Sequence, residues 1–299
     1  MKIILKCLLV SLIIAVSGNT VAAQSKADSP QSGLLWEVEG KGLKQPSYLF
    51  GTYHLIGKNF LDTLPGIMRQ FSKSNMIVGE VVIGDEMSMA QKLMPMMMLQ
   101  NNTLDKILTE KEFAETDSFL KAKAGMDLNT LKMMKPASVQ LIIVSMLAPK
   151  DISPTNPALD MYFQNEAKAA NKAVAGLETI EEQGDILFNT PIERQKDMLL
   201  KTIRESARMT AESNLLYEKY KKQDLDAIEK SFLENTDYTA AEMDELLAKR
   251  NKTWVQKMPE MMSKGSVFFA VGAGHLVGDE GLINLLREAG YTLKPLSLR

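Results

Sequence analysis

Cysteine and histidine are scarce in this chain, which has one cysteine and two histidines among 299 residues. Cys7 lies within an N-terminal segment that we expect to be removed on export. The mature chain should therefore have no disulfide, no thiol nucleophile and no thiolate ligand for a metal. A chain of this length can bury a sizeable apolar core without such crosslinks.

A strong net charge and a second long apolar run are also missing. The 35 basic and 37 acidic residues give a formal charge of -2, which argues against a polyanion-binding surface and a nucleic-acid partner. Without a further apolar run we expect no stable membrane anchor after export. The sequence has no G-x-S-x-G and no H-E-x-x-H motif, which disfavours a serine hydrolase and a helix-borne zinc protease.

The N-terminal segment has the layout of a secretory signal peptide. Two lysines precede an apolar run from Leu8 to Val16, and a small-residue exit ends at Ala23. We predict a signal peptide over residues 1–23 and a flexible polar leader over residues 24–33. The mature protein should then be periplasmic or secreted.

Strand signals are concentrated at the two ends of the remaining chain. Short apolar runs predict strands at residues 34–38, 47–50, 76–83, 173–177, 266–271 and 291–296. Helical patterns that begin at Pro65 and at Gly281 connect strands at each end. Such strand-helix-strand units are typical of parallel pairing, so we predict an α/β fold with a mixed central sheet built from both chain ends.

The middle of the chain is mostly helical. Apolar periodicity predicts helices over residues 87–99, 110–124, 136–147, 159–171, 191–220, 225–233 and 240–263. Pro95 and Pro259 should kink or shorten the first and the last of these. We interpret residues 87–263 as a large helical insertion or cap. Because no Pro/Gly/Ser-rich linker interrupts residues 34–299, we expect one domain over that range.

One helical stretch, Met87 to Met98, is rich in methionine. Methionine is a flexible filler of helix cores and adaptable binding grooves. In an oxidising compartment its thioether could also bind Cu(I). The sequence leaves both interpretations open.

Both histidines occur in the same local pattern, Gly-x-x-His at the end of an apolar run. One pattern runs from Gly51 to His54 and the other from Gly272 to His275, and glycine lets backbone approach an ion or substrate closely. With Glu80, both histidines fall near the ends of predicted strands, where parallel sheets bind ligands. Two imidazoles and one carboxylate form a ligand set of catalytic metal sites. A separate structural role for each histidine is the alternative.

These motifs resemble the TraB/GumN family, to which the animal Tiki proteins, described as metal-dependent proteases, are related. The resemblance rests on the two Gly-x-x-His motifs and on three segments in the family's order, Val78–Val81, Gly176–Gln183 and Val271–Gly278. It covers nearly the whole mature chain.

The resemblance implies a metallohydrolase in which two histidines and a glutamate are essential, and these map to His54, His275 and Glu80. Glu178 and Arg250 also fall in family motifs, as does Asn251. We expect Glu178 to accept a proton and Arg250 to stabilise a tetrahedral oxyanion. An N-cap or salt bridge for Glu178 and a solvated helix face for Arg250 are the alternatives. The implied cofactor is one divalent ion, and Mn, Co and Zn fit this ligand set.

The sequence thus favours an exported metal-dependent hydrolase, a peptidase acting on a peptide or protein substrate. A non-catalytic periplasmic binding protein for haem, a metal complex or a peptide is the alternative. Tyr53 beside His54 keeps haem open, because phenolate and imidazole both ligate iron.

Overall fold

The computed structural model describes residues 33–234 and 237–298. Cys7, the predicted signal peptide and all of the predicted leader except Gly33 lie outside these residues. None of the helices in the described ranges is both long enough and apolar enough to cross a membrane.

The described chain divides into two compact units. One contains all the strands and is formed by residues up to 83, 150–179 and 215 onward; the other is helical and comprises residues 84–149 and 180–214. The predicted fold class is confirmed: both chain ends build a mixed sheet, and helices fill most of the chain between them. That residues 34–299 form one domain stays a prediction.

The sheet has strand order β4-β3-β5-β2-β1-β6. Its strands are β1 (Leu35–Glu39), β2 (Ser47–Thr52), β3 (Met76–Gly79), β4 (Ala173–Gly176), β5 (Val267–Gly272) and β6 (Thr292–Pro295). The first four strands in that order are mutually parallel, and β1 is antiparallel to both of its neighbours. Strand β5, from the C-terminal part of the chain, therefore lies between β2 and β3, from the N-terminal part.

Two strand predictions need correction. The final strand β6 does not lie beside β5, because β2 and β1 separate the two, so the strand-helix-strand units interleave instead of forming independent pairs. The strand predicted over 76–83 ends at Gly79. Beyond it the Gln164 side chain accepts from the Ile83 N–H and donates to the Val81 carbonyl, both at 2.8 Å, so a side-chain amide replaces strand pairing there.

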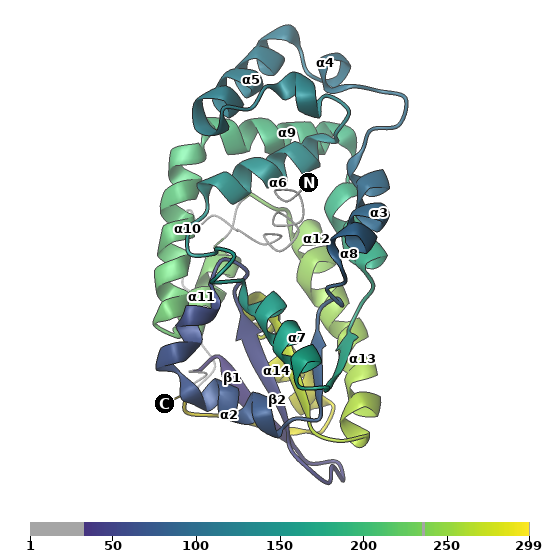
Figure 1. Cartoon of the computed structure of the whole chain (residues 1–299), viewed down its shortest axis with the longest axis vertical. Coiled ribbons are helices and arrows are strands. Elements are labelled where there is room, and N and C mark those ends of the chain that lie inside the picture. The colour runs from purple at the N-terminus through teal and green to yellow at the C-terminus, as the bar shows by residue number, and fades with distance from the viewer. Residues whose placement is uncertain (1–32, 235–236, 299) are drawn as a thin grey trace. The chain divides into compact units, whose positions relative to one another are not determined.

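Helices cover both faces of the sheet (Figure 1). On one face, Phe71 of α2 (Pro65–Lys73) and Phe163 of α7 (Leu159–Ala169) pack around Phe268 of β5, with ring centroids 5.2–5.8 Å apart. On the other face, Arg287 of α14 (Leu282–Glu288) lies over the Trp36 ring of β1. The sheet core is thus enclosed between α2 and α7 on one side and α14 on the other.

The sheet unit also contains the helical segments that follow Leu215. They are the end of α10 (Ser206–Lys221), α11 (Leu225–Leu233), α12 (Ala240–Met243), a π-helical turn η3 (Asp244–Ala248) and α13 (Lys249–Ser263). The helix predicted over 240–263 is helical throughout, but its second turn is wider than an α-helix. Pro259 lies inside α13 without ending it. The short helices η1 (Lys58–Thr63) and η4 (Ala273–His275) follow β2 and β5.

The helical unit contains α3 (Glu86–Met97), α4 (Leu104–Ile107), α5 (Glu110–Ala124), η2 (Leu128–Leu131), α6 (Pro136–Leu147), α8 (Ile180–Phe188), α9 (Ile192–Arg204) and the start of α10. The helix predicted over 191–220 is in fact two, because Glu205 leaves the helical conformation. Helix α8 was not predicted.

The methionine-rich stretch forms α3, which packs against α8. Met89 and Met97 are buried, and the Met96 sulfur lies so close to Gly184 of α8 that any larger residue there would clash with it. These contacts favour the core-filling interpretation of the methionines.

Candidate active site

Four neighbouring strands end at one edge of the sheet, and each is followed by a residue singled out from the sequence. His54 follows β2, Glu80 follows β3, Glu178 follows β4, and His275 follows β5 at the end of η4. Because the strands are parallel and adjacent, their carboxyl ends lie together. The structure therefore brings these four residues to one region, and α13 adds Arg250.

Gly272, the last residue of β5, marks the point where the three proposed ligands meet. A Cβ placed on Gly272 would lie 3.2 Å from Glu80 Oε1, 3.7 Å from His275 Cδ2 and 3.8 Å from His54 Nε2. The Gly272 N–H also donates to Glu80 Oε1 at 2.8 Å. A glycine is needed here because a side chain would occupy the space between the two imidazoles and the carboxylate.

The Arg250 guanidinium joins the glutamates to His275. Its Nη2 donates to Glu80 Oε2 at 2.6 Å and to Glu178 Oε1 at 2.7 Å, and its Nε donates to Glu178 Oε2 at 3.0 Å. Its Nη1 lies 3.0 Å from His275 Nε2 and donates to the Leu246 carbonyl in the π-helical turn. Only 9% of the Arg250 side chain is exposed, so these contacts lie in a low-dielectric environment.

Asp160, in the first turn of α7, fixes the orientation of His54. The Nδ1 of His54 lies 2.8 Å from Asp160 Oδ2, and the Thr52 hydroxyl donates to Asp160 Oδ1 at 2.7 Å. With Nδ1–H donating to the carboxylate, Nε2 is the imidazole atom directed toward Gly272 and Glu80. This carboxylate–histidine arrangement is the one that commonly orients a metal-binding imidazole.

Asn251 and Trp254, both on α13, hold His275. Asn251 Nδ2 donates to the His275 and Glu280 carbonyls, so Asn251 Oδ1 is the acceptor for His275 Nδ1 at 2.7 Å. The Trp254 ring packs against the His275 ring with centroids 4.4 Å apart. The remaining nitrogen, Nε2, lies 3.8 Å from Glu80 Oε1. His275 is thus a neutral imidazole with its Nε2 lone pair facing Arg250 and Glu80.

The two histidines have opposite electrostatic environments. Burial alone lowers the pKa of His54, but the charge and hydrogen bond of Asp160, with the charge of Glu80, raise that pKa to about 9. Burial and the charge of Arg250 lower the pKa of His275 to about 3. At neutral pH the Nε2 of His54 therefore carries a proton that a cation would displace, whereas the Nε2 of His275 carries none.

The pKa values of the two glutamates, Glu80 and Glu178, are shifted in opposite directions. Against the effect of burial, the charge of Arg250 holds the pKa of Glu80 well below its usual range. Burial raises the pKa of Glu178 despite its contact with Arg250. Glu80 is therefore an anion at neutral pH, as a metal ligand must be.

The donor atoms fit a divalent ion in their chemistry, although they are not spaced as a ready-made cage. Among the described residues, no group of three or more His, Asp or Glu side chains stands in a metal-holding arrangement. The Arg250 guanidinium contacts both Glu80 Oε2 and His275 Nε2. The 3.8 Å between His275 Nε2 and Glu80 Oε1 is within the roughly 4 Å that two ligands about 2.1 Å from one ion can span.

The roles of Asp160, Thr52 and Trp254 were not predicted from the sequence. Asp160 lies 106 residues from His54 in the chain, and its only local signal is an acid in the first turn of a helix, which is common on protein surfaces. Tyr53 is buried, and its ring packs against Tyr220 with centroids 5.4 Å apart. This packing gives no support to the haem alternative.

Comparison with known proteins agrees with these motifs. Residues 34–295 match the model of the TraB/PrgY/gumN family. The chain is 25% identical to the metalloprotease TIKI2 of Danio rerio, over 92% of this chain and 64% of that protein. It is 24% identical to the metalloprotease TIKI1 of Xenopus tropicalis, over 89% of this chain and 62% of that protein.

The chain thus spans less than two thirds of the length of these two relatives. No solved structure matches it. The family resemblance seen in the motifs is confirmed by a match that covers nearly all of the described residues. This chain belongs to the TraB/PrgY/gumN family.

Proposed function

We propose that this protein is an exported metal-dependent peptidase in which His54, His275 and Glu80 hold one divalent ion. The observation that carries the proposal is the convergence of these three side chains around Gly272, at the carboxyl ends of three adjacent parallel strands. The relatives named metalloproteases support the reaction class. Mn, Co and Zn all accept mixed imidazole and carboxylate ligands.

A bound divalent ion would lower the pKa of a water molecule and polarise the scissile carbonyl. The chain's own residues then have separate tasks. Asp160 and Asn251 hold the imidazoles so that both Nε2 atoms are directed toward Glu80. All five N–H groups of Arg250 have partners in the structure, and the Nη1–H beside His275 Nε2 is the one that a cation bound at that nitrogen would release. That N–H could then stabilise a developing oxyanion.

We assign Glu178 a positioning role instead of the proton-acceptor role expected from the sequence. Both of its carboxylate oxygens accept hydrogen bonds from Arg250, and Oε2 also accepts from the Trp254 indole at 3.2 Å. A carboxylate engaged in this way fixes the guanidinium fork in one orientation. Its lone pairs are directed at Arg250 and Trp254, which disfavours proton transfer.

The test combines metal analysis with peptide hydrolysis. The purified protein is loaded with Mn, Co or Zn in turn, its metal content is measured by mass spectrometry, and a mixture of synthetic peptides is searched for new termini. We expect one ion per chain and cleaved peptides for at least one metal. The His275→Ala variant should lose most of the metal and the cleavage together, because it lacks one ligand.

Thr253→Ala is the matched control, because Thr253 lies on α13 beside the site residues but is exposed. It should retain both metal and cleavage. Failure of the wild-type protein to bind any of the three metals would refute the proposal. Metal binding without cleavage of any peptide would refute the peptidase assignment and leave a metal-binding protein.

A further inference from the structure

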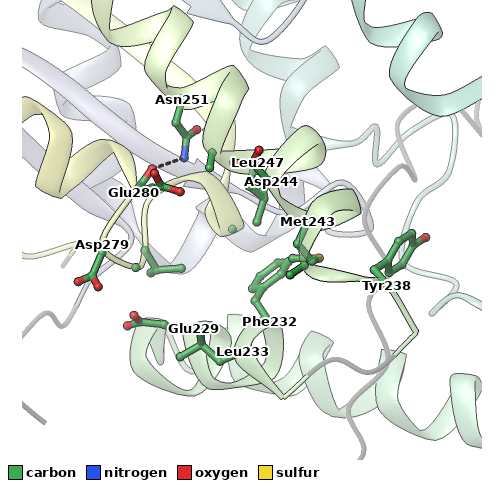
Figure 2. A pocket seen from close by; sticks show the side chains of 15 residues that line it. Glu229, Phe232, Leu233, Tyr238, Met243, Asp244, Leu247, Asn251, Asp279 and Glu280 are labelled. Atoms are coloured by element: carbon green, nitrogen blue, oxygen red, sulfur yellow. Dashed lines mark hydrogen bonds between the residues drawn. The ribbon is translucent and has the colours of Figure 1, made fainter. Parts of the chain in front are cut away.

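A pocket of about 510 Å³ adjoins the candidate active site and is not used by the proposed reaction. It lies between α11, the α12–η3 segment and the loop that follows His275 (Figure 2). Apolar side chains form much of its wall, among them Phe232, Leu233, Leu247 and Val277. Leu233 is 76% exposed, so this part of the apolar wall is open to solvent.

The charged lining of the pocket has one sign. Glu229, Asp244, Asp279 and Glu280 line it, and among the described residues no lysine, arginine or histidine does. Asp244 and Glu280 form ion pairs with Lys249 and Lys252 of α13, outside the pocket.

Of the four acidic residues that line the pocket, Glu229 and Asp279 form no ion pair with a Lys or Arg of the described chain. Figure 2 shows both at one end of the pocket, away from Met243 and Tyr238. Burial, with the charges of Asp226 and Asp279, raises the pKa of Glu229. These like charges repel one another, so a cation placed between them would relieve the repulsion.

The pocket is connected to the active site by two direct contacts. Asn251 lines the pocket and also accepts a hydrogen bond from His275 Nδ1. Gly274, next to His275, lies under the Phe232 ring so closely that a Cβ on it would be 2.5 Å from Phe232 Cζ. The His275 loop and Asn251 therefore form a wall that the pocket shares with the proposed metal site.

We propose that this pocket binds a segment of the substrate polypeptide that carries a basic side chain next to an apolar one. The lysine or arginine of that segment would lie between Glu229 and Asp279, and the apolar side chain would pack on Phe232, Leu233 and Val277. A volume of about 510 Å³ is within the usual range for pockets that enclose a small ligand. That the segment belongs to a substrate rests on the proposed peptidase function.

The test is a binding measurement on metal-free protein, so that it does not depend on catalysis. The probe is a fluorescein-labelled peptide, Gly-Leu-Lys-Phe-Lys-Gly, and its twin has glutamate in place of lysine. We expect the basic peptide to raise the fluorescence anisotropy with saturation, and the acidic twin to bind at least about tenfold more weakly, since like charges repel. The apolar contribution is tested with Leu233→Asn, which should weaken binding of the basic peptide.

The charge contribution is tested with the double variant Glu229→Gln/Asp279→Asn. Loss of two partly exposed ion pairs should weaken binding of the basic peptide about fivefold or more. The control Glu218→Gln/Glu260→Gln removes the same charge from exposed positions outside the pocket, and its affinity should stay within about twofold of wild type. Melting curves establish that each variant is folded.

Three results would overturn the pocket assignment. They are no saturable binding of the basic peptide, equal binding of the acidic twin, and equal weakening in the two double variants. The His54→Ala variant separates this inference from the proposed function, because it should lose metal yet keep peptide binding. Peptide binding by a protein that neither binds metal nor cleaves peptides would sustain the pocket and refute the peptidase.

Discussion

Asp160 Oδ2 lies 2.8 Å from His54 Nδ1, which ties the first turn of α7 to the residues that follow β2. The Thr52 hydroxyl occupies the other Asp160 oxygen. The carboxylate therefore has two fixed partners, and the His54 ring has one orientation.

The first prediction concerns the variant Asp160→Asn. In metal-free protein this change should lower the pKa of His54 from about 9 to below 6.5, because burial then acts without the opposing charge. The two histidines of the chain give few imidazole signals, so NMR titration can follow His54 directly. A His54 pKa that remains near 9 in the variant would show that Asp160 is not the cause.

The same shift predicts how stability depends on pH. A group whose pKa is higher in the folded than in the unfolded protein stabilises the fold below the unfolded pKa, and this contribution disappears as pH rises through the folded pKa. For His54 the contribution should be present below pH 6.5 and lost by about pH 9. It amounts to at most about 3 kcal/mol. Denaturant unfolding at several pH values should show this loss in wild type and not in Asp160→Asn.

The second prediction concerns the pair His54 and His275. If both hold one ion, replacement of either by Ala should remove most of the bound metal, and the double variant should be barely worse than either single one. Metal content and melting temperature are measured for wild type, both single variants and the double variant. Additive destabilisation with unchanged metal content would instead mean two separate structural roles.

The third prediction is that Gly272→Ala disrupts the site without disrupting the fold. The backbone of Gly272, with φ -53° and ψ 136°, is accessible to alanine, but the new methyl would lie 3.2 Å from Glu80 Oε1. Metal affinity should fall by about tenfold or more, and the free energy of unfolding of metal-free protein should change by less than about 1 kcal/mol.

Gly84→Ala is the control for this prediction, since its added methyl would meet its nearest neighbour at 3.7 Å, an ordinary contact. It should change neither metal affinity nor stability appreciably. Unaltered metal binding in Gly272→Ala would place the ion away from β5.

The fourth prediction is that Arg250→Met destabilises the metal-free protein and increases the response to metal. Glu80 and Glu178 would be left buried without their cation, at a cost of about 3–5 kcal/mol. Because Arg250 contacts both Glu80 and His275, its removal also frees two proposed ligands. Added Mn, Co or Zn should therefore raise the melting temperature of the variant more than that of wild type.

Lys249→Met, a change at the exposed neighbouring position, should leave the metal response at the wild-type level. If Arg250→Met does not fold, Arg250→Lys retains the charge beside the glutamates but lacks the guanidinium fork, so it tests the release of His275 alone. A smaller metal response than in wild type would mean that Arg250 helps to retain the ion.

The fifth prediction concerns the packing of α2. Lys172 Nζ donates to the carbonyls of Phe71, Ser72 and Ser74, each at 2.8 Å, at the C-terminal end of that helix. Lys172→Met should lower the free energy of unfolding by roughly 2 kcal/mol, because the carbonyls lose a charged donor. Lys44→Met, at an exposed turn position, should have no measurable effect in the same denaturant titration.

Part of the site could be predicted because its signals are local. The apolar runs before Gly51 and Gly272 specify strands that end shortly before each histidine. Once the strands are assigned as parallel, their carboxyl ends share one edge of the sheet, and His54, Glu80 and His275 follow these ends. That the three strands are also neighbours, which brings the residues together, did not follow from these local signals.

The remaining features depend on contacts between distant segments. The insertion of β5 between β2 and β3, and the position of β6 at the far edge, depend on the relative stabilities of alternative strand pairings. Asp160 and Arg250 belong to helices whose sequences show only ordinary surface charges. Their roles arise from how α7 and α13 are placed against the strand ends, which local periodicity does not specify.

The central position of β5 has a consequence for how the chain folds. Strands β2 and β3 are made early in synthesis but do not pair with each other, because each pairs with a strand made about 200 residues later. The backbone N–H and C=O groups of β2 and β3 that pair with β5 are bonded to solvent or to transient partners until Val267–Gly272 has been synthesised. Sheet closure is thus a late, non-local step, which is slow for reasons of chain entropy. The active site is assembled in that same step, so no chain that ends before His275 can contain it.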